Sequence, residues 1–344
     1  MKGSSAEMYL LDTLYYLYKK EKRETLLNGS KEIAAEIGKP ACLIAMDMII
    51  CSLKYGAMFT EYRDLDFAHR NVKNRETYIT TFFNFKLYDK YNDKEYRNEF
   101  HDKINFLKKF DSLIKRDWID INNCTDKEME RFLHMHDRCI LKSSYGDSGK
   151  EVELYNISPQ IDVATFRKYM NVHKYNLVEE CLTNHENLAI FNESSLNTIR
   201  IVTIRNGNNV EFLFAGLRVG AAGAVLDNIS QGGAVARIDL DSGKINSEFF
   251  GKKSSNYKSI GSRKSPLGKK IPFWKEVRQL AANAAQVIPE VRIVAWDICV
   301  TKTGPEIIEG NESFGSVIMQ VFNKSNDVGL KPRLKEILEK NNAK

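Results

Sequence analysis

The chain has 344 residues, of which 43% are hydrophobic, 28% charged and 10% aromatic. This composition excludes a disordered chain and is typical of a folded protein with enough residues for two or three packed lobes. The net charge of +6 does not require nucleic acid as a partner, because phosphate groups, another acidic substrate or a solvated lysine-rich surface would explain it equally well.

The cysteines and the N-terminus favour a cytoplasmic protein. The six cysteines form no CxxC motif and no metal-ligand spacing, which indicates reduced thiols. No signal peptide is expected, since the N-terminal segment carries acidic residues and has no small-residue cleavage site. The best apolar run, residues 41–51, contains Asp47 and is too short to cross a bilayer, so any membrane role would be peripheral.

Residues 5–115 are predicted to be helical. In the first segment, apolar residues recur at helical spacing, at Met8, Leu11, Leu14, Tyr15 and Tyr18. The triplet 28–30, Asn-Gly-Ser, is predicted to end one helix and cap the next, and Pro40 marks another break. Residues 78–110 alternate aromatic and charged side chains without turn signals, which again predicts helix.

The pattern changes near Asp117, beyond which glycine becomes frequent. The predicted strands of this part are residues 118–121, 138–144, 151–157 and 175–181. The predicted helices between them are residues 126–134 and 165–170.

Antiparallel strands dominate the C-terminal half. The run TIRIVTIR, the turn residues 206–209 (NGNN) and the run VEFLFAGLRV predict a hairpin, and AVARIDLDSGKI adds a strand. A helix is predicted over residues 274–287. A second hairpin follows in RIVAWDICVTKTGPEIIEGNES, with its turn at residues 302–305.

The second hairpin carries the strongest chemical signal. Asp297 interrupts an apolar strand, and Glu309 and Asn311 are two residues apart, so both side chains point to one face. The hairpin can bring Asp297 opposite them. Two carboxylates and an amide oxygen make an all-oxygen site that suits Mg²⁺ bridging phosphates. The alternative is a buried acid with a local partner and two exposed turn residues.

A second signal is the segment 142–150, KSSYGDSGK. A strand ends at Lys142, and a Gly/Ser loop follows whose backbone N–H groups can surround phosphate oxygens. The segment is not a P-loop, because GxxxxGK[ST] is missing and no helix follows directly. Many ordinary hairpins also contain Gly and Ser, so this signal is weak by itself.

A third signal is the strand end at residues 178–182, with Glu186 close behind. If this is an edge strand, its backbone N–H and C=O groups can face an adenine ring, and the Glu186 carboxylate can accept from ribose hydroxyls. An ordinary surface turn is the alternative reading.

In this order, these signals resemble the ATP-grasp superfamily, and more narrowly its sugar-transfer-associated branch, which accompanies polysaccharide synthesis genes. The likeness covers about residues 50–325. It rests on the segments YGAMFTEYRDLDF, YITTFFNFKLYDKYNDK, FHDKINFLKKF, SLNTIRIVTIR, LRVG, LDNISQGGAVARID, IPFW and AWDICVTKTGPEIIEGN.

The resemblance implies an α+β ATP-grasp fold, in which two α+β lobes hold ATP between them after a helical N-terminal region. The implied division is a helical region 1–115, a small lobe 116–182, a large lobe 183–330 with the metal site, and a basic tail 331–344.

The resemblance also implies a role for each site residue. The phosphate-binding set would be Lys103, Lys142, Ser143, Ser144, Gly146, Ser148 and Gly149. The nucleoside-binding set would be Glu179, Glu180, Leu182 and Glu186, with backbone groups of Glu180 and Leu182 at the adenine and Glu186 at the ribose. Two Mg²⁺ ions would bind Asp297, Glu309 and Asn311.

One position departs from the family pattern. Many ATP-grasp ligases have an arginine two residues before the metal-binding Asp, where this chain has Ala295. Arg200 and Arg218 are the candidates to supply that charge, and together with Lys142 they form the predicted catalytic set. A structural ion pair is the alternative role for both arginines.

The implied activity is an ATP-dependent carboxylate–amine ligase that works through an acyl phosphate, with a uronic acid or an amino sugar among its substrates. A kinase acting on a sugar hydroxyl and a non-catalytic ATP-binding module are the alternatives. Neither nucleic acid nor a transmembrane segment is expected, and any association with a glycan synthesis machine would be peripheral. The basic segment 252–270 is either a solvated loop or a lid over an anionic substrate, and the polar turn 227–233 is a candidate wall of the acceptor pocket.

Overall fold

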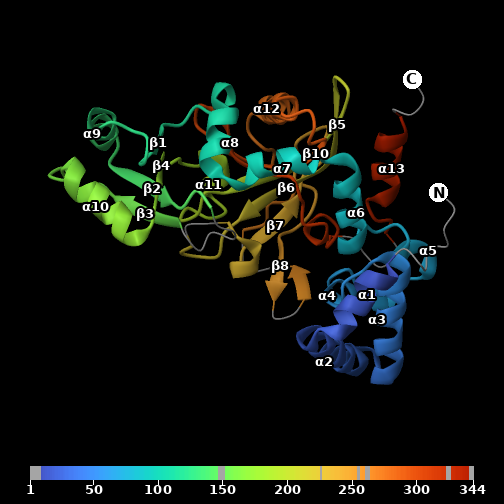
Figure 1. Cartoon of the computed structure of the whole chain (residues 1–344). Coiled ribbons are helices and arrows are strands. Elements are labelled where there is room, and N and C mark those ends of the chain that lie inside the picture. The colour runs from blue at the N-terminus through green and yellow to red at the C-terminus, as the bar shows by residue number, and fades with distance from the viewer. Residues whose placement is uncertain are drawn as a thin grey trace. The chain divides into compact units, whose positions relative to one another are not determined.

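The computed structural model describes residues 9–145, 152–224, 227–253, 256–259, 264–322 and 327–340. They form two compact units (Figure 1). The first comprises the described parts of Met1–Asn92, Phe250–Ser259 and Ser313–Lys344, and the second those of Asp93–Phe249 and Ile260–Glu312. The domain boundaries implied at residues 115, 182 and 330 remain predictions. In the described part of the chain, no helix is long and apolar enough to cross a membrane.

The first unit is mainly helical. Its helices are α1 (Leu10–Tyr18), α2 (Lys20–Ile37), α3 (Ala41–Tyr55), α4 (Phe59–Asp64), η1 (Phe67–His69), α5 (Val72–Arg75), α6 (Thr81–Tyr91), η4 (Val317–Met319) and α13 (Lys331–Glu339). The strands β8 (Phe250–Lys253) and β9 (Asn256–Ser259) add an antiparallel hairpin. Buried side chains from α2, α3 and α4, among them Ile33, Met48 and Tyr62, form its core.

The helix end predicted at residues 28–30 is wrong. Helix α2 continues through Gly29 and ends at Gly38, whose φ of 69° lies in the left-handed region. Leu26 and Ile33 are buried on either side of this triplet. Their burial outweighs the roughly 1 kcal/mol by which a mid-helix glycine is less favourable than alanine. The break at Pro40 is confirmed, since α3 begins directly after it.

Residues 78–110 are helical as predicted, but in three separate helices. After α6 come α7 (Lys94–His101) and α8 (Lys103–Lys109). The Asp93 carboxylate accepts from the Glu95 N–H at 3.0 Å, and the Asp102 carboxylate accepts from the Ile104 N–H at 2.8 Å. An aspartate that caps a helix N-terminus marks a new start, and this signal was available in the sequence.

The second unit contains a small antiparallel sheet. Its strands are β1 (Trp118–Asp120), β2 (Arg138–Lys142), β3 (Val152–Asn156) and β4 (Leu177–Glu180), in the order β1-β4-β2-β3. Helices α9 (Asp126–Met135) and α10 (Val163–His173) contribute Met129 and Phe166 to the core beneath it. The predicted edge strand is wrong: β4 lies between β1 and β2, which take up its backbone groups on both sides.

The larger sheet supplies five strands to this unit, in the order β11-β10-β5-β6-β7. They are β5 (Thr198–Asn206), β6 (Asn209–Val219), β7 (Ala234–Arg237), β10 (Ile293–Thr301) and β11 (Gly304–Asn311), and each pairs antiparallel with its neighbours. Both predicted hairpins are confirmed. The described remainder of the unit includes α11 (Glu186–Ala189), α12 (Trp274–Ala284), η2 (Asp111–Leu113) and η3 (Ile229–Gln231).

The two faces of the larger sheet differ in chemistry. One face packs Ile199, Trp296 and Ile298 into a core shared with α12. Because side chains alternate along a strand, the neighbouring positions Arg200 and Asp297 point to the opposite face. This polar face carries the candidate site.

Candidate nucleotide and metal site

Asp297 lies at the centre of the polar face. In the strand register it is opposite Glu309 of β11 on one side and Arg200 of β5 on the other. Arg200 Nη2 donates to Asp297 Oδ2 at 2.8 Å, and Arg218 Nη1 donates to the same oxygen at 2.8 Å. The structure therefore brings together both arginines, Asp297 and Glu309, and the third predicted metal ligand, Asn311, is hydrogen-bonded to Glu309.

A bulge in β11 decides which of its side chains reach this face. Asp297 pairs with Glu309, but Ile298 pairs with Ile307, so Ile308 is an extra residue in the ladder. Without the bulge, Ile307 and Glu309 would share a face. With it, Ile307 enters the apolar core while Glu309 stays beside Asp297.

The bulge also brings Glu306 to the polar side, where it pairs with Cys299 in the register. Glu306 is three residues from Glu309, so strict alternation would place the two on opposite faces. Glu306 was therefore not predicted from the sequence, because the residue pattern of the strand does not indicate a bulge.

The charges on this face perturb one another. Burial would raise the pKa of Asp297, but Arg200 and Arg218 lower it to about 2. Burial raises the pKa of Glu309, and the neighbouring negative charge of Asp297 raises it further. Two carboxylates this close, one held ionised and the other favouring its proton, form a pair that a cation would stabilise.

Arg218 continues the network away from Asp297. Its Nη2 donates to Asp227 Oδ1 at 2.9 Å, and the hydroxyl of Thr198 donates to the other Asp227 oxygen. Asp227 belongs to the predicted polar turn, and the structure places it beside the arginine. The Nε of Arg218 is buried and has no acceptor among the described residues.

The three predicted metal ligands lie side by side, and their role in holding a magnesium ion remains a prediction. The described residues contain no cluster of three or more His, Cys, Asp or Glu side chains able to hold a metal ion. The donors would thus be Asp297, Glu309 and Asn311 alone, with Asn311 Nδ2 now donating to Glu309 Oε1 at 3.3 Å. Mg²⁺ commonly binds one or two carboxylates and completes its shell with waters and substrate phosphates.

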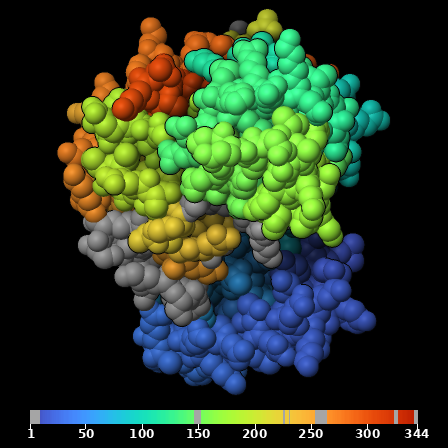
Figure 2. Space-filling model, turned by 90° about the vertical axis from the view of Figure 1, so that its left-hand side faces the viewer, coloured from blue at the N-terminus to red at the C-terminus, as the bar shows by residue number. Residues whose placement is uncertain are grey.

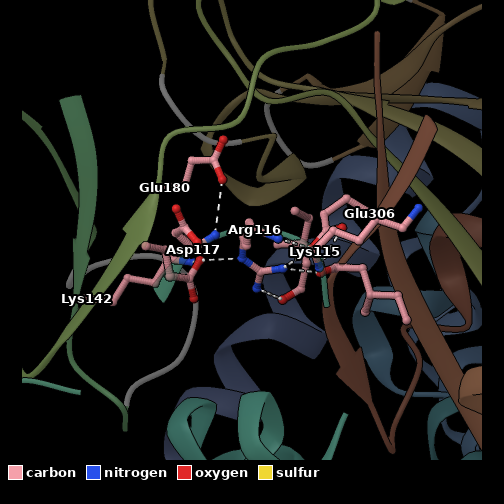
Figure 3. A network of polar contacts seen from close by, with 9 residues as sticks. Lys115, Arg116, Asp117, Lys142, Glu180 and Glu306 are labelled. Carbon is pink, nitrogen blue, oxygen red and sulfur yellow. Dashed lines mark hydrogen bonds and ion pairs between the residues drawn. The ribbon is translucent and has the colours of Figure 1, made fainter. Parts of the chain in front are cut away.

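A second buried network surrounds Arg116, which precedes β1 (Figure 3). Its Nε donates to Glu179 Oε2 at 3.3 Å and its Nη1 to Glu306 Oε1 at 3.0 Å. The guanidinium also donates to the carbonyls of Ile307 and Ile308, the residues of the bulge. Arg116 thereby ties β4 of the small sheet to β11 of the larger one, next to Glu309.

Lys142 joins this network from β2. Its Nζ donates to Glu179 Oε2 at 2.7 Å. Burial would raise the pKa of Glu179, but Arg116 and Lys142 lower it to about 2, so the carboxylate stays ionised. Arg116, like Glu306, was not singled out from the sequence, since a charged residue just before a short strand is unremarkable.

The start of the Gly/Ser loop is fixed by hydrogen bonds. The Ser144 N–H donates to Asn176 Oδ1 at 2.7 Å, and the Ser144 carbonyl accepts from the Lys103 N–H at 3.0 Å. Lys103, at the start of α8, therefore lies beside Ser144, in the described first part of the loop. Gly146, Ser148 and Gly149 lie outside the described residues.

The residues predicted to bind the nucleoside differ in whether their groups are already hydrogen-bonded within the protein. The N–H of Glu180 donates to the Asp117 carbonyl at 2.8 Å, so this group is already used. Leu182 follows the end of β4 and is half-buried, whereas Glu186 is exposed at the start of α11. The His185 N–H donates to the Val300 carbonyl at 2.7 Å, which places Glu186 near the end of β10, the strand of Asp297.

A family model described as sugar-transfer associated ATP-grasp matches residues 82–339. The chain belongs to this ATP-grasp family. The family and the fold predicted from the motifs are thereby confirmed, and the match includes every predicted site residue. No curated protein matches the chain in sequence.

Several solved structures resemble this ATP-grasp chain distantly. The ADP complex of purK, an N5-carboxyaminoimidazole ribonucleotide synthetase, is 10% identical over 63% of this chain and 46% of its own, with a TM-score of 0.39. The ATP-grasp ligase PsnB with its minimal precursor is 14% identical over 75% and 68%, with a TM-score of 0.41. The L-amino acid ligase from Bacillus licheniformis is 9% identical over 70% and 48%, with a TM-score of 0.40. The chain thus spans about half the length of the first and third structures.

Proposed function

We propose that the protein is an ATP-dependent carboxylate–amine ligase, acting in the cytoplasm and forming an amide on a uronic acid or an amino sugar for a surface polysaccharide. The observation that carries this proposal is the Nε–H of Arg218, beside the Asp297–Glu309 pair, for which the described residues offer no acceptor. A buried donor without an acceptor is unfavourable by roughly 1–3 kcal/mol, and a substrate oxygen would satisfy it.

The nucleotide would lie between the two networks. Lys103 and Lys142 would hold its phosphates under the loop 143–149, with Glu179 orienting Lys142. Leu182 and Glu186 would contact adenine and ribose. Glu180, whose N–H is engaged, could offer adenine only its carbonyl. Mg²⁺ bound to Asp297, Glu309 and Asn311, with two ions expected, would neutralise charge on the phosphates.

The reaction would proceed in two displacements. An oxygen of the substrate carboxylate attacks the γ-phosphorus, the bond from phosphorus to the β–γ bridging oxygen breaks, and ADP leaves with the electron pair. The amine nitrogen then attacks the acyl carbon of the resulting acyl phosphate. The bond from that carbon to the phosphate oxygen breaks, inorganic phosphate leaves, and the nitrogen loses a proton to solvent.

Arg218 would act in the second displacement. Its Nε–H would donate to the oxyanion that forms when the amine adds, while Asp297 and Asp227 hold the guanidinium in place. Arg200 would keep Asp297 ionised and oriented rather than touch the substrate, because its Nε and Nη2 both donate to that carboxylate.

Isotope transfer tests the proposal. The protein is incubated with Mg-ATP, an amine and a uronic acid whose carboxylate carries ¹⁸O, across a panel of uronic acids and amines. A ligase moves one labelled oxygen into the released phosphate, and hydroxylamine in place of the amine yields a hydroxamate. A kinase would leave the γ-phosphate on a hydroxyl without moving label, and a non-catalytic module would do neither; both results would overturn the proposal.

Variants connect the reaction to the site. Arg218→Met is expected to lower kcat by about 100- to 1,000-fold, as loss of an oxyanion donor does elsewhere. Arg218→Lys should recover little activity, because lysine keeps the charge but not the planar arrangement of donors. The matched control is Arg131→Met on the exposed side of α9, which should leave kcat unchanged.

A further inference from the structure

Helix α1 presents an unbroken apolar stripe to solvent. The exposed residues are Leu10, Leu11, Leu14, Tyr15 and Tyr18, and the stripe contains no charged residue. Leu11 is 80% exposed and Tyr18 78% exposed, values typical of lysine rather than of leucine or tyrosine. The spacing i, i+1, i+4, i+5, i+8 is that of a single helix face.

The opposite face of α1 is already occupied. Thr13 is buried and hydrogen-bonds Ser52 of α3 at 2.9 Å, and Tyr16 and Leu17 pack against the core of the first unit. The helix is thus apolar on both faces, a pattern expected where both are covered. The described residues of the first unit cover only one of these two faces.

Basic residues stand at the C-terminal end of the stripe. Residues 19–24 contain four basic and two acidic side chains, so this segment carries a net charge of +2. The Lys19 ammonium lies 5.2 Å from the centre of the exposed Tyr15 ring, and the Lys20 side chain is 84% exposed, with its ammonium 3.9 Å from the exposed Glu24 carboxylate. Leucine and tyrosine bordered by lysine make up the side-chain set of helices that lie in a membrane interface, where the cations meet anionic headgroups.

Other occupants fit less well. A helix of nine residues is about 14 Å long and about 10 Å wide, so a second copy docked on this stripe alone would bury far less than the roughly 800 Å² per partner of a stable dimer. Residues 1–8 contribute only Met1 and Met8 as large apolar side chains, too few to cover five exposed ones.

We propose that the exposed stripe of α1, together with Lys19 and Lys20, docks the protein on an anionic lipid bilayer. The helix lies in the plane of the interface, with its leucines and tyrosines among the upper acyl chains and the lysines at the headgroups. The N-terminal helices that carry this surface form the blue region of Figure 2. The inference is independent of the reaction proposed for the second unit.

Vesicle co-sedimentation tests this inference with the full chain. The protein should pellet with vesicles of phosphatidylcholine and phosphatidylglycerol, and much less with phosphatidylcholine alone or at high salt. The double substitution Leu11→Gln/Tyr18→Gln, at positions that face solvent, should lower binding to the mixed vesicles about ten-fold or more. Lys19→Ala/Lys20→Ala should abolish the preference for the anionic lipid.

Two control variants keep the test specific. Val172→Gln changes a residue of the second unit that is 69% exposed, and Lys302→Ala removes an exposed charge in the β10–β11 turn. Both should bind vesicles like the unmodified protein. Failure to pellet with anionic vesicles, or equal pelleting of the Leu11→Gln/Tyr18→Gln variant, would overturn the proposal. So would a concentration-dependent dimer that this variant abolishes, because a second copy would then cover the stripe.

Discussion

Replacing Arg116 with methionine removes a cation that touches both Glu179 and Glu306. The Arg116 side chain is 1% exposed, and the two glutamates are 5% and 4% exposed. Methionine has a comparable length, so the substitution removes charge and hydrogen bonds while keeping most of the packing. Lys142 remains beside Glu179, but the partners left to Glu306 within the described structure are the backbone N–H groups of residues 115 and 116.

The expected loss of stability in Arg116→Met can be worked out from the two carboxylates. Held at a pKa of about 2 instead of 4.5, Glu179 contributes on the order of 3 kcal/mol to stability at neutral pH, shared between Arg116 and Lys142. Leaving Glu306 buried without its cation adds a further penalty. Removing one partner from a buried ion pair typically destabilises a protein by about 3–5 kcal/mol, and we expect Arg116→Met to fall in that range.

Urea unfolding followed by tryptophan fluorescence measures this loss. All three tryptophans, Trp118, Trp274 and Trp296, lie in the second unit, so the signal reports the unit that contains Arg116. The stability difference between the unmodified protein and Arg116→Met should also depend on pH in a defined direction. A carboxylate with a lowered pKa stabilises the fold above its unfolded pKa, and that contribution is lost as the pH falls toward its folded pKa. The difference between the unmodified protein and Arg116→Met should therefore shrink on acidification below about pH 4.5.

Two further variants complete the experiment. Arg116→Met/Glu306→Gln should be more stable than Arg116→Met, because the second change removes the unpaired charge. Arg131→Met, at an exposed position, should stay within about 0.5 kcal/mol of the unmodified protein. A loss below about 1 kcal/mol for Arg116→Met, or no recovery in the double variant, would show that the glutamates do not depend on this arginine.

Two other substitutions and one labelling reaction test further features of the structure. Glu309→Gln should raise the melting temperature at neutral pH and abolish ATP turnover. Because the pKa of Glu309 is raised, its ionised form destabilises the fold at neutral pH. The rise in melting temperature caused by the substitution should therefore become smaller as the pH drops and Glu309 is protonated. An unchanged melting temperature at neutral pH would contradict this reasoning. Gly310→Ala should destabilise by about 1–3 kcal/mol in the urea assay, because the new Cβ would lie 2.8 Å from Trp296, and a neutral result would show that the ring can move. A thiol reagent on the native protein should modify exposed Cys42 well before buried Cys299, whose pKa burial raises to about 12, and equal labelling by mass spectrometry would argue against that burial.

Local signals predicted much of the fold. Alternation and turn residues located both hairpins of the larger sheet, and the second one places Asp297 opposite Glu309 as expected. These predictions succeeded because a hairpin is closed by contacts near in sequence, so the residues that specify it lie within the segment itself. The aspartate caps at Asp93 and Asp102 are equally local.

Predictions failed where a distant neighbour decided the outcome. Helix α2 continues past Gly29 because buried residues on both sides of that glycine pack against other helices. Strand β4 is internal because β1, which begins at Trp118, adds to its free side. Residue propensities and the hydrophobic pattern of a segment contain no information about such distant partners, because burial across the whole unit decides which segments pack together.

The sequence by itself determined the family, the two hairpins and the position of Asp297 opposite Glu309, because these depend on motif order and on short-range periodicity. Only the tertiary structure showed that a bulge turns Glu306 and Glu309 to the same face, and that Arg116 lies 63 and 190 positions from the glutamates it pairs with. An unpaired charge is unfavourable in the low-dielectric interior, so each buried charged group is stabilised by a partner of opposite charge. That partner can come from any part of the chain.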